Sequence, residues 1–318
     1  MAKTTFTGND WDAFKNRATV DPSSGRTKSA NEIFADEMRP EFDPKNIKVR
    51  ESFDSPEFPL STPVAIGLDV TGSMGRIPHN LITDGLGRMV EDILNKKPVT
   101  DPQLMFMAIG DSKNDQAPLQ ATQFETDIRI AEQLKNLWLE GNGGGNYGES
   151  YHLAWYFLAR KADIDSYKKR GVKGILLTVG DENIHQVLTK QEIERVFGDS
   201  VAADISSEEL LQMVEQRFDV YHLMVKENGR DNTSDGGKRW NDLLGERVIP
   251  VTDYTKIPEI IVATLEVIAG KPKNEVVASW DGSTALAVKT AINGLSQPIR
   301  TGGLTQAGAK KVWRPGVK

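Results

Sequence analysis

The feature that most constrains this chain is the alternation of short apolar runs with amphipathic segments between residues 61 and 270. Nearly continuous runs of Val, Ile, Leu, Met and Ala are typical of strands buried on both faces. Strands separated by helices predict right-handed βαβ units. We therefore expect an α/β fold with a doubly wound, mainly parallel six-stranded sheet and helices on both faces, its strands at 63–71, 104–111, 118–125 (a short edge strand), 172–181, 218–226 and 247–253.

Helices are predicted where apolar residues recur at steps of three and four. The segments with this spacing are 82–94, 127–138, 149–163, 189–197, 207–217, 236–245, 255–269 and 283–294. Residues 1–60 are polar and interrupted by prolines, and nothing there alternates strongly enough to predict a strand. The chain is therefore divided into a polar N-terminal extension (1–60), an α/β domain (61–270) and a basic, glycine-rich C-terminal extension (271–318), irregular outside its one predicted helix.

Charge is distributed unevenly along the sequence. The net charge of −6 comprises −2 in residues 1–60, −10 in residues 61–270 and +6 in residues 271–318. Sequence-independent affinity for nucleic acid depends on neutralising phosphates with Lys and Arg, so the acidic domain argues against that class of protein. The basic tail is a candidate contact for an anionic partner.

The chain contains no cysteine, which excludes disulfides, thiolate nucleophiles and cysteine metal sites. No apolar run is long enough for a membrane helix, and the first residues do not resemble a secretory signal. We expect a cytoplasmic protein that does not bind membranes, or alternatively a component of a virion or another large assembly.

Oxygen-bearing side chains follow several of the predicted strands. Asp69, Thr71 and Ser73 stand at alternate positions where the first strand ends, and Asp181 ends the strand at 172–181. The glycine loop before the helix at 149–163 adds Asn146. Ligands of parallel α/β sheets bind outside the carboxyl ends of the strands, and hard oxygen donors suit Mg²⁺. The sequence therefore predicts a divalent-cation site at this edge.

These residues resemble the metal-ion-dependent adhesion site of von Willebrand factor type A domains. Asp69-Val70-Thr71-Gly72-Ser73 is similar to the D-x-S-x-S motif, and Asp181 matches the third motif of the family. Asn146 stands where the second motif normally carries threonine, a departure that replaces a hydroxyl with an amide. In intracellular members the second and third loops resemble GGGNYGES and GDENIH, with Glu149 and His185 at the matching places.

The resemblance implies a Rossmann-like fold and a non-catalytic module. Its cofactor would be Mg²⁺, with Mn²⁺ or Ca²⁺ as alternatives, held by Asp69, Thr71, Ser73, Asn146 and Asp181, with Glu149 and His185 beside them. A protein partner would complete the coordination with an acidic side chain. Because intracellular members often act as adaptors, a MoxR-type AAA+ ATPase is the expected partner, and a structural part in a larger, viral assembly is the alternative.

Two enzyme classes are weaker alternatives. Haloacid-dehalogenase phosphatases also place an aspartate after the first strand, but Thr71 replaces the aspartate that acts as their general acid. A serine hydrolase would use Ser73 in a nucleophile elbow, yet Thr71 stands where that motif requires glycine. We therefore expect no catalytic residues.

Overall fold

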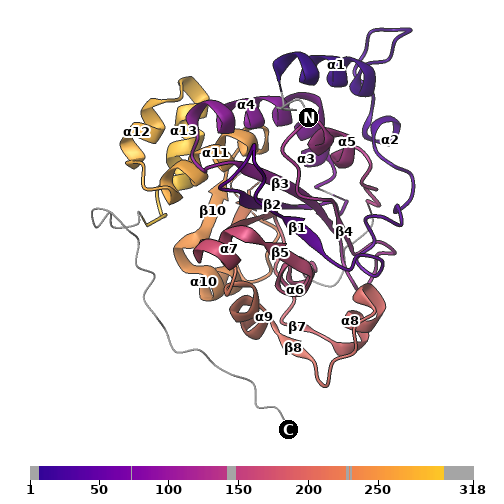
Figure 1. Cartoon of the computed structure of the whole chain (residues 1–318). Helices are drawn as coiled ribbons and strands as arrows, with labels where there is room; N and C mark the ends of the chain where they lie inside the picture. The colour runs from indigo at the N-terminus through magenta and orange to yellow at the C-terminus, as the bar shows by residue number, and fades with distance from the viewer. Residues whose placement is uncertain (1–6, 73, 142–147, 227–228, 230, 297–318) are drawn as a thin grey trace.

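A six-stranded sheet forms the centre of the molecule in the computed structural model, which describes residues 7–72, 74–141, 148–226, 229 and 231–296. The strand order is β10-β9-β6-β2-β3-β4, and every neighbouring pair is parallel except β3 and the edge strand β4. The predicted fold class is confirmed (Figure 1). The strands are β2 (Thr62–Asp69), β3 (Pro102–Ile109), β4 (Leu119–Ala121), β6 (Gly174–Gly180), β9 (Phe218–Val225) and β10 (Val248–Val251).

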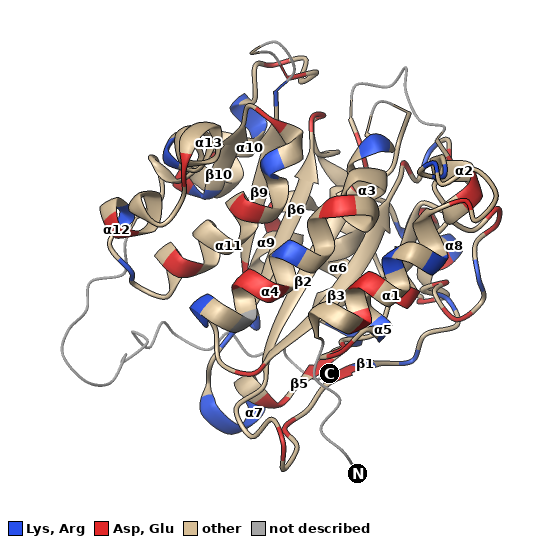
Figure 2. Cartoon of the chain, turned by 90° about the horizontal axis from the view of Figure 1, so that it is seen from above, with Lys and Arg blue, Asp and Glu red and all other residues tan. Residues whose placement is uncertain are grey.

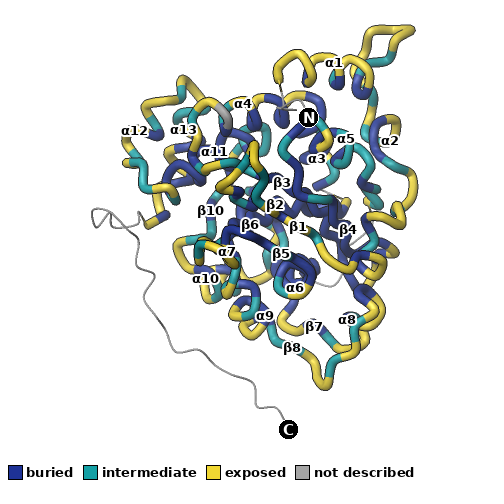
Figure 3. Tube along the Cα trace, in the orientation of Figure 1, coloured by how far each residue is buried: buried dark blue, intermediate teal, exposed yellow. Residues whose placement is uncertain are grey.

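Both faces of the sheet are covered, which explains why its strands read as continuous apolar runs. Along β2, Val64 and Ile66 belong to one buried cluster, whereas Ala65 between them belongs to the other. Successive side chains of a strand point to opposite faces, so a strand covered on both sides has no polar face. Figure 3 shows the buried strands at the centre and the exposed residues around the periphery.

Helices from different parts of the chain divide between the two faces. The first cluster includes residues of α3 (Arg76–Asn80), the π-helical turn η1 (Leu81–Gly85), α4 (Leu86–Lys96), α5 (Arg129–Leu134), α11 (Ile257–Ile268) and α13 (Gly282–Ile292). The second includes residues of α6 (Tyr151–Lys161), α8 (Lys190–Phe197), α9 (Ser207–Val214) and α10 (Lys238–Leu244). Figure 2 shows that charged residues lie mainly on helices and loops, while the strands are largely uncharged.

The N-terminal residues pack against the sheet and its helices. In α1 (Gly8–Thr19), Trp11 and Phe14 contribute to the first cluster, followed by the short helix α2 (Ala30–Ile33). The expectation that residues 1–60 hold no strand is wrong, because β1 (Arg50–Ser52) pairs in parallel with β5 (Ala162–Ile164). Three residues are too few for a periodic signal, so this strand exists through its tertiary partner.

Residues after 270 also join the main core. The predicted helix at 283–294 corresponds to α13, and Val288 is fully buried there. A second helix, α12 (Lys273–Ala278), forms where the sequence predicts irregular chain, and it buries Val276. The remaining elements are α7 (Asp165–Arg170) and the antiparallel pair β7 (Val187–Leu188) and β8 (Ile205–Ser206). Within the described part of the chain, no helix has the length and apolar character to cross a membrane.

Candidate functional site

Asp69, the last residue of β2, is buried, and each of its carboxylate oxygens accepts a hydrogen bond. Its Oδ1 accepts from the backbone nitrogen of Thr71 at 2.9 Å and from the Thr71 hydroxyl at 2.6 Å. Its Oδ2 accepts from the Tyr151 hydroxyl at 2.6 Å. Burial raises the pKa of Asp69 above its ordinary value, against the opposing effect of these hydrogen bonds. The carboxylate is therefore held in one orientation at the carboxyl edge of the sheet.

Tyr151, at the start of α6, reaches Asp69 because the neighbouring strand ends in glycine. A Cβ atom on Gly180 would lie 1.9 Å from the Tyr151 hydroxyl oxygen and 2.9 Å from Asp69 Oδ2. Any larger residue at 180 would occupy the position of the tyrosine hydroxyl. Tyr151 is fully buried, and burial, followed by the negative charge of Asp69, raises the pKa of its hydroxyl well above the ordinary value.

Asp181 lies at the same edge, directly after β6. The register pairs Leu68 with Val179, so Asp69 and Asp181 lie at the carboxyl ends of adjacent parallel strands. Asp181 is buried, and its Oδ2 accepts from the side-chain amide of Asn232, whose backbone nitrogen also donates to Asp181 O at 2.9 Å. The negative charges of Asp69 and Asp181 both raise the pKa of Tyr151, as expected for carboxylates that flank one hydroxyl.

Glu149 brings a further buried carboxyl group to this edge. Its backbone nitrogen donates to Asn183 O at 2.8 Å, which fixes the segment before α6 against the loop after β6. Its side-chain Oε2 is buried and has no hydrogen-bond partner among the residues that the structure describes. Burial, together with negative charges at Asp69, Asp111, Asp115 and Glu182, raises the pKa of Glu149 to about 10.

Two of those negative charges, Asp111 and Asp115, come from the loop after β3, which is absent from the site predicted from the sequence. Asp111 is fully buried, and its Oδ2 accepts from Asn114 Nδ2 at 2.7 Å. Asp115 Oδ2 accepts from the backbone nitrogen of Asp111 at 2.7 Å. A Cβ on Gly110 would approach this oxygen to 2.4 Å, so glycine permits the tight turn. Asp111 ends the predicted strand at 104–111, as Asp181 ends the strand at 172–181, so the same sequence signal could have placed both residues at the site.

His185 bonds to Asp111 and lies between the site and a neighbouring cavity. Its Nε2 is 2.9 Å from Asp111 Oδ1, and its Nδ1 is 3.4 Å from Lys113 Nζ. Because a lysine ammonium only donates, Nδ1 acts as the acceptor and Nε2–H as the donor to the carboxylate. Asp111 Oδ1 also accepts from Ser150 Oγ at 3.2 Å. His185 therefore belongs to the Asp111 side of the site, whereas Glu149 lies near enough to Asp69 for the charge of Asp69 to raise its pKa.

The structure thus brings together Asp69, Thr71, Glu149 and Asp181, while Ser73 and Asn146 lie outside the described residues. Among the residues that are described, no three His, Asp or Glu side chains form a group able to hold a metal ion by themselves. The arrangement fits a hard cation that has few protein ligands and retains water, as Mg²⁺ usually does. The unpartnered Glu149 oxygen and the concentration of buried negative charge fit a nearby cation rather than an apolar ligand.

Comparisons with known proteins give distant structural likenesses only. No protein-family model matches the sequence, and no curated protein matches it. The pilus adhesin SpaC of Lactobacillus rhamnosus GG, in its open conformation, aligns with a TM-score of 0.44 at 8% identity, over 70% of this chain and 31% of its own. Proximal thread matrix protein 1 from the mussel byssus aligns with a TM-score of 0.40 at 11% identity, over 66% of this chain and 46% of its own.

The same mussel protein with a zinc-occupied MIDAS motif aligns with a TM-score of 0.38 at 9% identity, over 65% of this chain and 48% of its own. This chain therefore spans less than half the length of these proteins. Because every one of these TM-scores is below 0.5, the likenesses carry no argument about the site.

Proposed function

We propose that the carboxyl edge of the sheet binds one divalent cation, Mg²⁺ in the first place, and that the chain is a von Willebrand factor A-like protein-interaction module. The observation that carries the proposal is the buried carboxyl cluster around Glu149, whose pKa is raised to about 10 by burial and by the acidic groups around it. Buried like charges destabilise a fold unless a proton or a cation neutralises them. A bound cation would supply that neutralisation.

The donor atoms support a hard cation. Asp69 and Asp181 would supply carboxylate oxygens, and Thr71 would supply a hydroxyl oxygen, which keeps lone pairs available while its proton is donated to Asp69. In this proposal Ser73 and Asn146 complete the protein ligands. Mn²⁺ and Ca²⁺ also accept such oxygen donors, so the identity of the ion is part of the experiment.

A binding role accounts for these contacts better than phosphoryl transfer does. Phosphoryl transfer of the haloacid-dehalogenase type also needs a general acid, and Thr71, whose hydroxyl donates to Asp69, stands where that acid would be. We propose that an acidic side chain of a protein partner becomes the final ligand. A MoxR-type ATPase and a larger, viral assembly are the two proposed settings for such a partner.

Calorimetry with Mg²⁺, Mn²⁺ and Ca²⁺ tests the cation site. Asp69→Asn preserves the size of the side chain and removes one charge, so we expect at least a tenfold loss of affinity, about 1.4 kcal/mol. Asp242→Asn is the matched control, because Asp242 is exposed and pairs with Lys238 on α10. Equal cation affinity in the parent and Asp69→Asn would show that the site is misassigned.

Affinity purification in Mg²⁺ and in EDTA tests the interaction role separately. We expect a partner recovered with the parent protein in Mg²⁺ to be lost both in EDTA and with Asp69→Asn. Recovery of that partner to the same extent under all three conditions would contradict cation-dependent docking, even if calorimetry detects the ion.

A further inference from the structure

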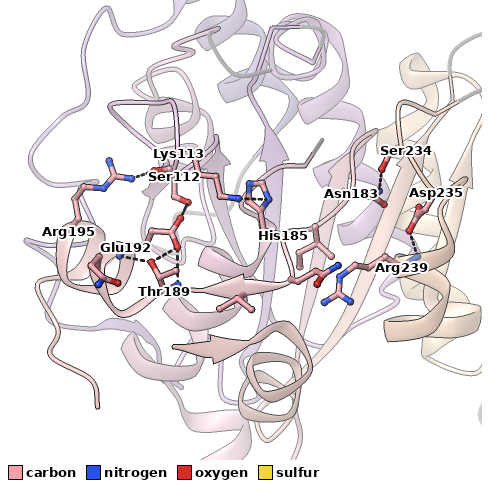
Figure 4. A pocket seen from close by; sticks show the side chains of 14 residues that line it. Ser112, Lys113, Asn183, His185, Thr189, Glu192, Arg195, Ser234, Asp235 and Arg239 are labelled. Atoms are coloured by element: carbon pink, nitrogen blue, oxygen red, sulfur yellow. Dashed lines mark hydrogen bonds between the residues drawn. The ribbon is translucent and has the colours of Figure 1, made fainter. Parts of the chain in front are cut away.

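A cavity of about 900 Å³ lies beside the carboxyl cluster and is not used by the cation site (Figure 4). Asn183 and His185 line it, and both belong to the loop that follows Asp181. The backbone of Asn183 accepts from Glu149 and the His185 ring contacts Asp111, so the cavity is a neighbour of the candidate site.

The cationic side chains of the cavity stand at its two ends. In Figure 4, Lys113 and Arg195 lie at one end and Arg239 at the other, with His185 between them. Both oxygens of Glu192 accept hydrogen bonds within the chain, Oε1 from Ser112 Oγ at 2.6 Å and Oε2 from the Thr189 nitrogen at 2.8 Å.

Asp235, the other acidic residue of the lining, is engaged in the same way. It accepts from the Gly237 nitrogen at 3.0 Å and from the Arg239 nitrogen at 2.9 Å. Three cations therefore face two carboxylates whose oxygens are already bonded, which favours an anionic ligand.

Arg239 has a guanidinium edge without a partner. Its Nη1 contacts Glu208 Oε1 at 3.2 Å, but its buried Nε and Nη2 have no hydrogen-bond partner among the described residues. These two N–H groups lie side by side and form the edge that binds a carboxylate through two parallel hydrogen bonds. Asn183, which is 6% exposed, also has a buried Oδ1 without a partner in the described part of the chain.

We infer that this cavity binds an acidic peptide segment of the partner, with a carboxylate of the peptide on the Nε and Nη2 edge of Arg239. The inference rests on the proposed function, because the same partner would supply the acidic ligand of the cation. The unpartnered acceptor of Asn183 distinguishes a peptide from an inorganic phosphate: a peptide offers backbone N–H donors as well as carboxylates, whereas a fully ionised phosphate offers only acceptors. Without the cation, the carboxyl cluster would repel such a peptide.

Fluorescence anisotropy with the full chain and two degenerate dodecapeptide pools tests the inference. One pool carries Asp or Glu at alternate positions, and the other carries Asn or Gln there. We expect tighter binding of the acidic pool, and a loss of about tenfold with Arg239→Gln, as for one charge-assisted pair. Arg239→Lys keeps the charge without the planar fork, so its loss is expected to be intermediate.

Lys238→Gln is the matched control: it removes one charge from the same helix, at a side chain that pairs with Asp242 and does not line the cavity. Its affinity is expected to stay within twofold of the parent. If Arg239→Gln unfolds at a lower temperature than the parent, Lys113→Gln provides a second test at the other end of the cavity. Equal affinity for the two pools, or acidic-pool binding unaffected by Arg239→Gln and Lys113→Gln, would overturn the inference.

Repeating the measurement in Mg²⁺ and in EDTA separates this inference from the proposed function. An Arg239→Gln effect without any Mg²⁺ dependence would support the peptide cavity and contradict the cation-dependent module. Mg²⁺-dependent binding that is unchanged in Arg239→Gln and Lys113→Gln would support the cation-dependent module and contradict the peptide cavity. Displacement of the acidic pool by pyrophosphate, at concentrations below those of the peptides, would assign the cavity to a phosphate ligand and overturn its assignment to a peptide.

Discussion

At the residue scale, the candidate site depends on close approaches that only glycine allows. Gly180 leaves room for the Tyr151 hydroxyl beside Asp69, and Gly110 leaves room for the Asp115 carboxylate. Both glycines lie where strands end, so the carboxyl groups approach the sheet edge closely. The result is a buried cluster of like charges, which lowers the stability of the protein without a cation and favours binding of one.

Changing Gly180 is expected to displace Tyr151. The Cβ atom of Gly180→Ala would overlap the tyrosine hydroxyl, and we expect a destabilisation of about 3 kcal/mol, typical of overpacking in a core. Tyr151→Phe removes one hydrogen bond to a charged group, at a cost of about 2 kcal/mol. The double variant is expected to lose less stability than the sum of the two single losses, because the tyrosine hydroxyl is the atom that the new Cβ would approach most closely. Urea unfolding of the four proteins in EDTA measures this coupling, and strict additivity would contradict the contact.

Glu149 makes a pH dependence testable. Its folded-state pKa, about 10, lies above the ordinary value of 4.5, so the folded state binds the proton more tightly. In EDTA, the contribution of Glu149 to stability is therefore greatest below pH 4.5. This contribution falls as the pH rises towards 10, by at most about 1.4 kcal/mol per pH unit. Glu149→Gln is expected to flatten this decline in thermal unfolding between pH 6 and 9; an unchanged slope would exclude Glu149 as its source.

At the element scale, a buried lysine joins the N-terminal segment to two helices. Lys161, at the end of α6, donates to Pro44 O and Ile47 O at 2.8 Å and to Phe197 O, at the end of α8, at 3.4 Å. The ammonium satisfies carbonyl groups that no secondary structure pairs, which explains a lysine that is only 9% exposed. A polar segment is thereby attached to the core through a charged group.

Lys161→Met preserves much of the side-chain length and removes the donors. We expect a destabilisation of about 3 kcal/mol, because a charged hydrogen-bond donor to buried carbonyls is lost. Limited proteolysis is expected to cut near residues 44–47 more rapidly than in the parent. Lys168→Met, at an exposed lysine paired with Asp163, is the control and is expected to change stability by less than about 1 kcal/mol. Equal losses in both variants would contradict a specific role for Lys161.

At the scale of the whole molecule, the two faces of the sheet pack against different kinds of side chain. One face packs α1, α4, α11 and α13 into a single apolar cluster, to which the N- and C-terminal segments both contribute. On the other face, aromatic and polar groups sit below the site: the His222 ring stacks on Trp240 at 3.7 Å and contacts Tyr151 edge-on at 5.1 Å. The protonation of these buried groups therefore affects the stability of the whole fold.

The complete pH profile is expected to have a maximum that shifts with the cation. Burial lowers the pKa of His152 to about 4 and that of His222 to about 3, from the ordinary 6.5. The stability that these neutral histidines contribute to the folded state is therefore complete above pH 6.5 and is lost as the pH falls below it. Since Glu149 acts in the opposite direction, we expect the highest melting temperature in EDTA near pH 6 to 7. Saturating Mg²⁺ is expected to move the maximum upward, because the cation favours the ionised carboxylates. A maximum at the same pH in EDTA and Mg²⁺ would contradict the coupling.

The sequence by itself determined the local elements and predicted which oxygen-bearing side chains belong to the candidate site. Continuous apolar runs predicted the strands because a sheet covered on both faces leaves no polar alternation, and helical spacing predicted most helices, with errors mainly at their ends. Asp69 and Asp181 were identified as site candidates because each stands where such a strand ends.

Only the tertiary structure decided which strands are neighbours and which side chains meet. The order β10-β9-β6-β2-β3-β4 places β6 and β3 on either side of β2, so that Tyr151, Asp111 and Asp115 gather around one edge. It also decided that α1, α12 and β1 have partners to pack against. The physical reason is that periodicity records the burial of a segment in its own sequence, whereas the identity of its partner depends on contacts between residues far apart in the chain.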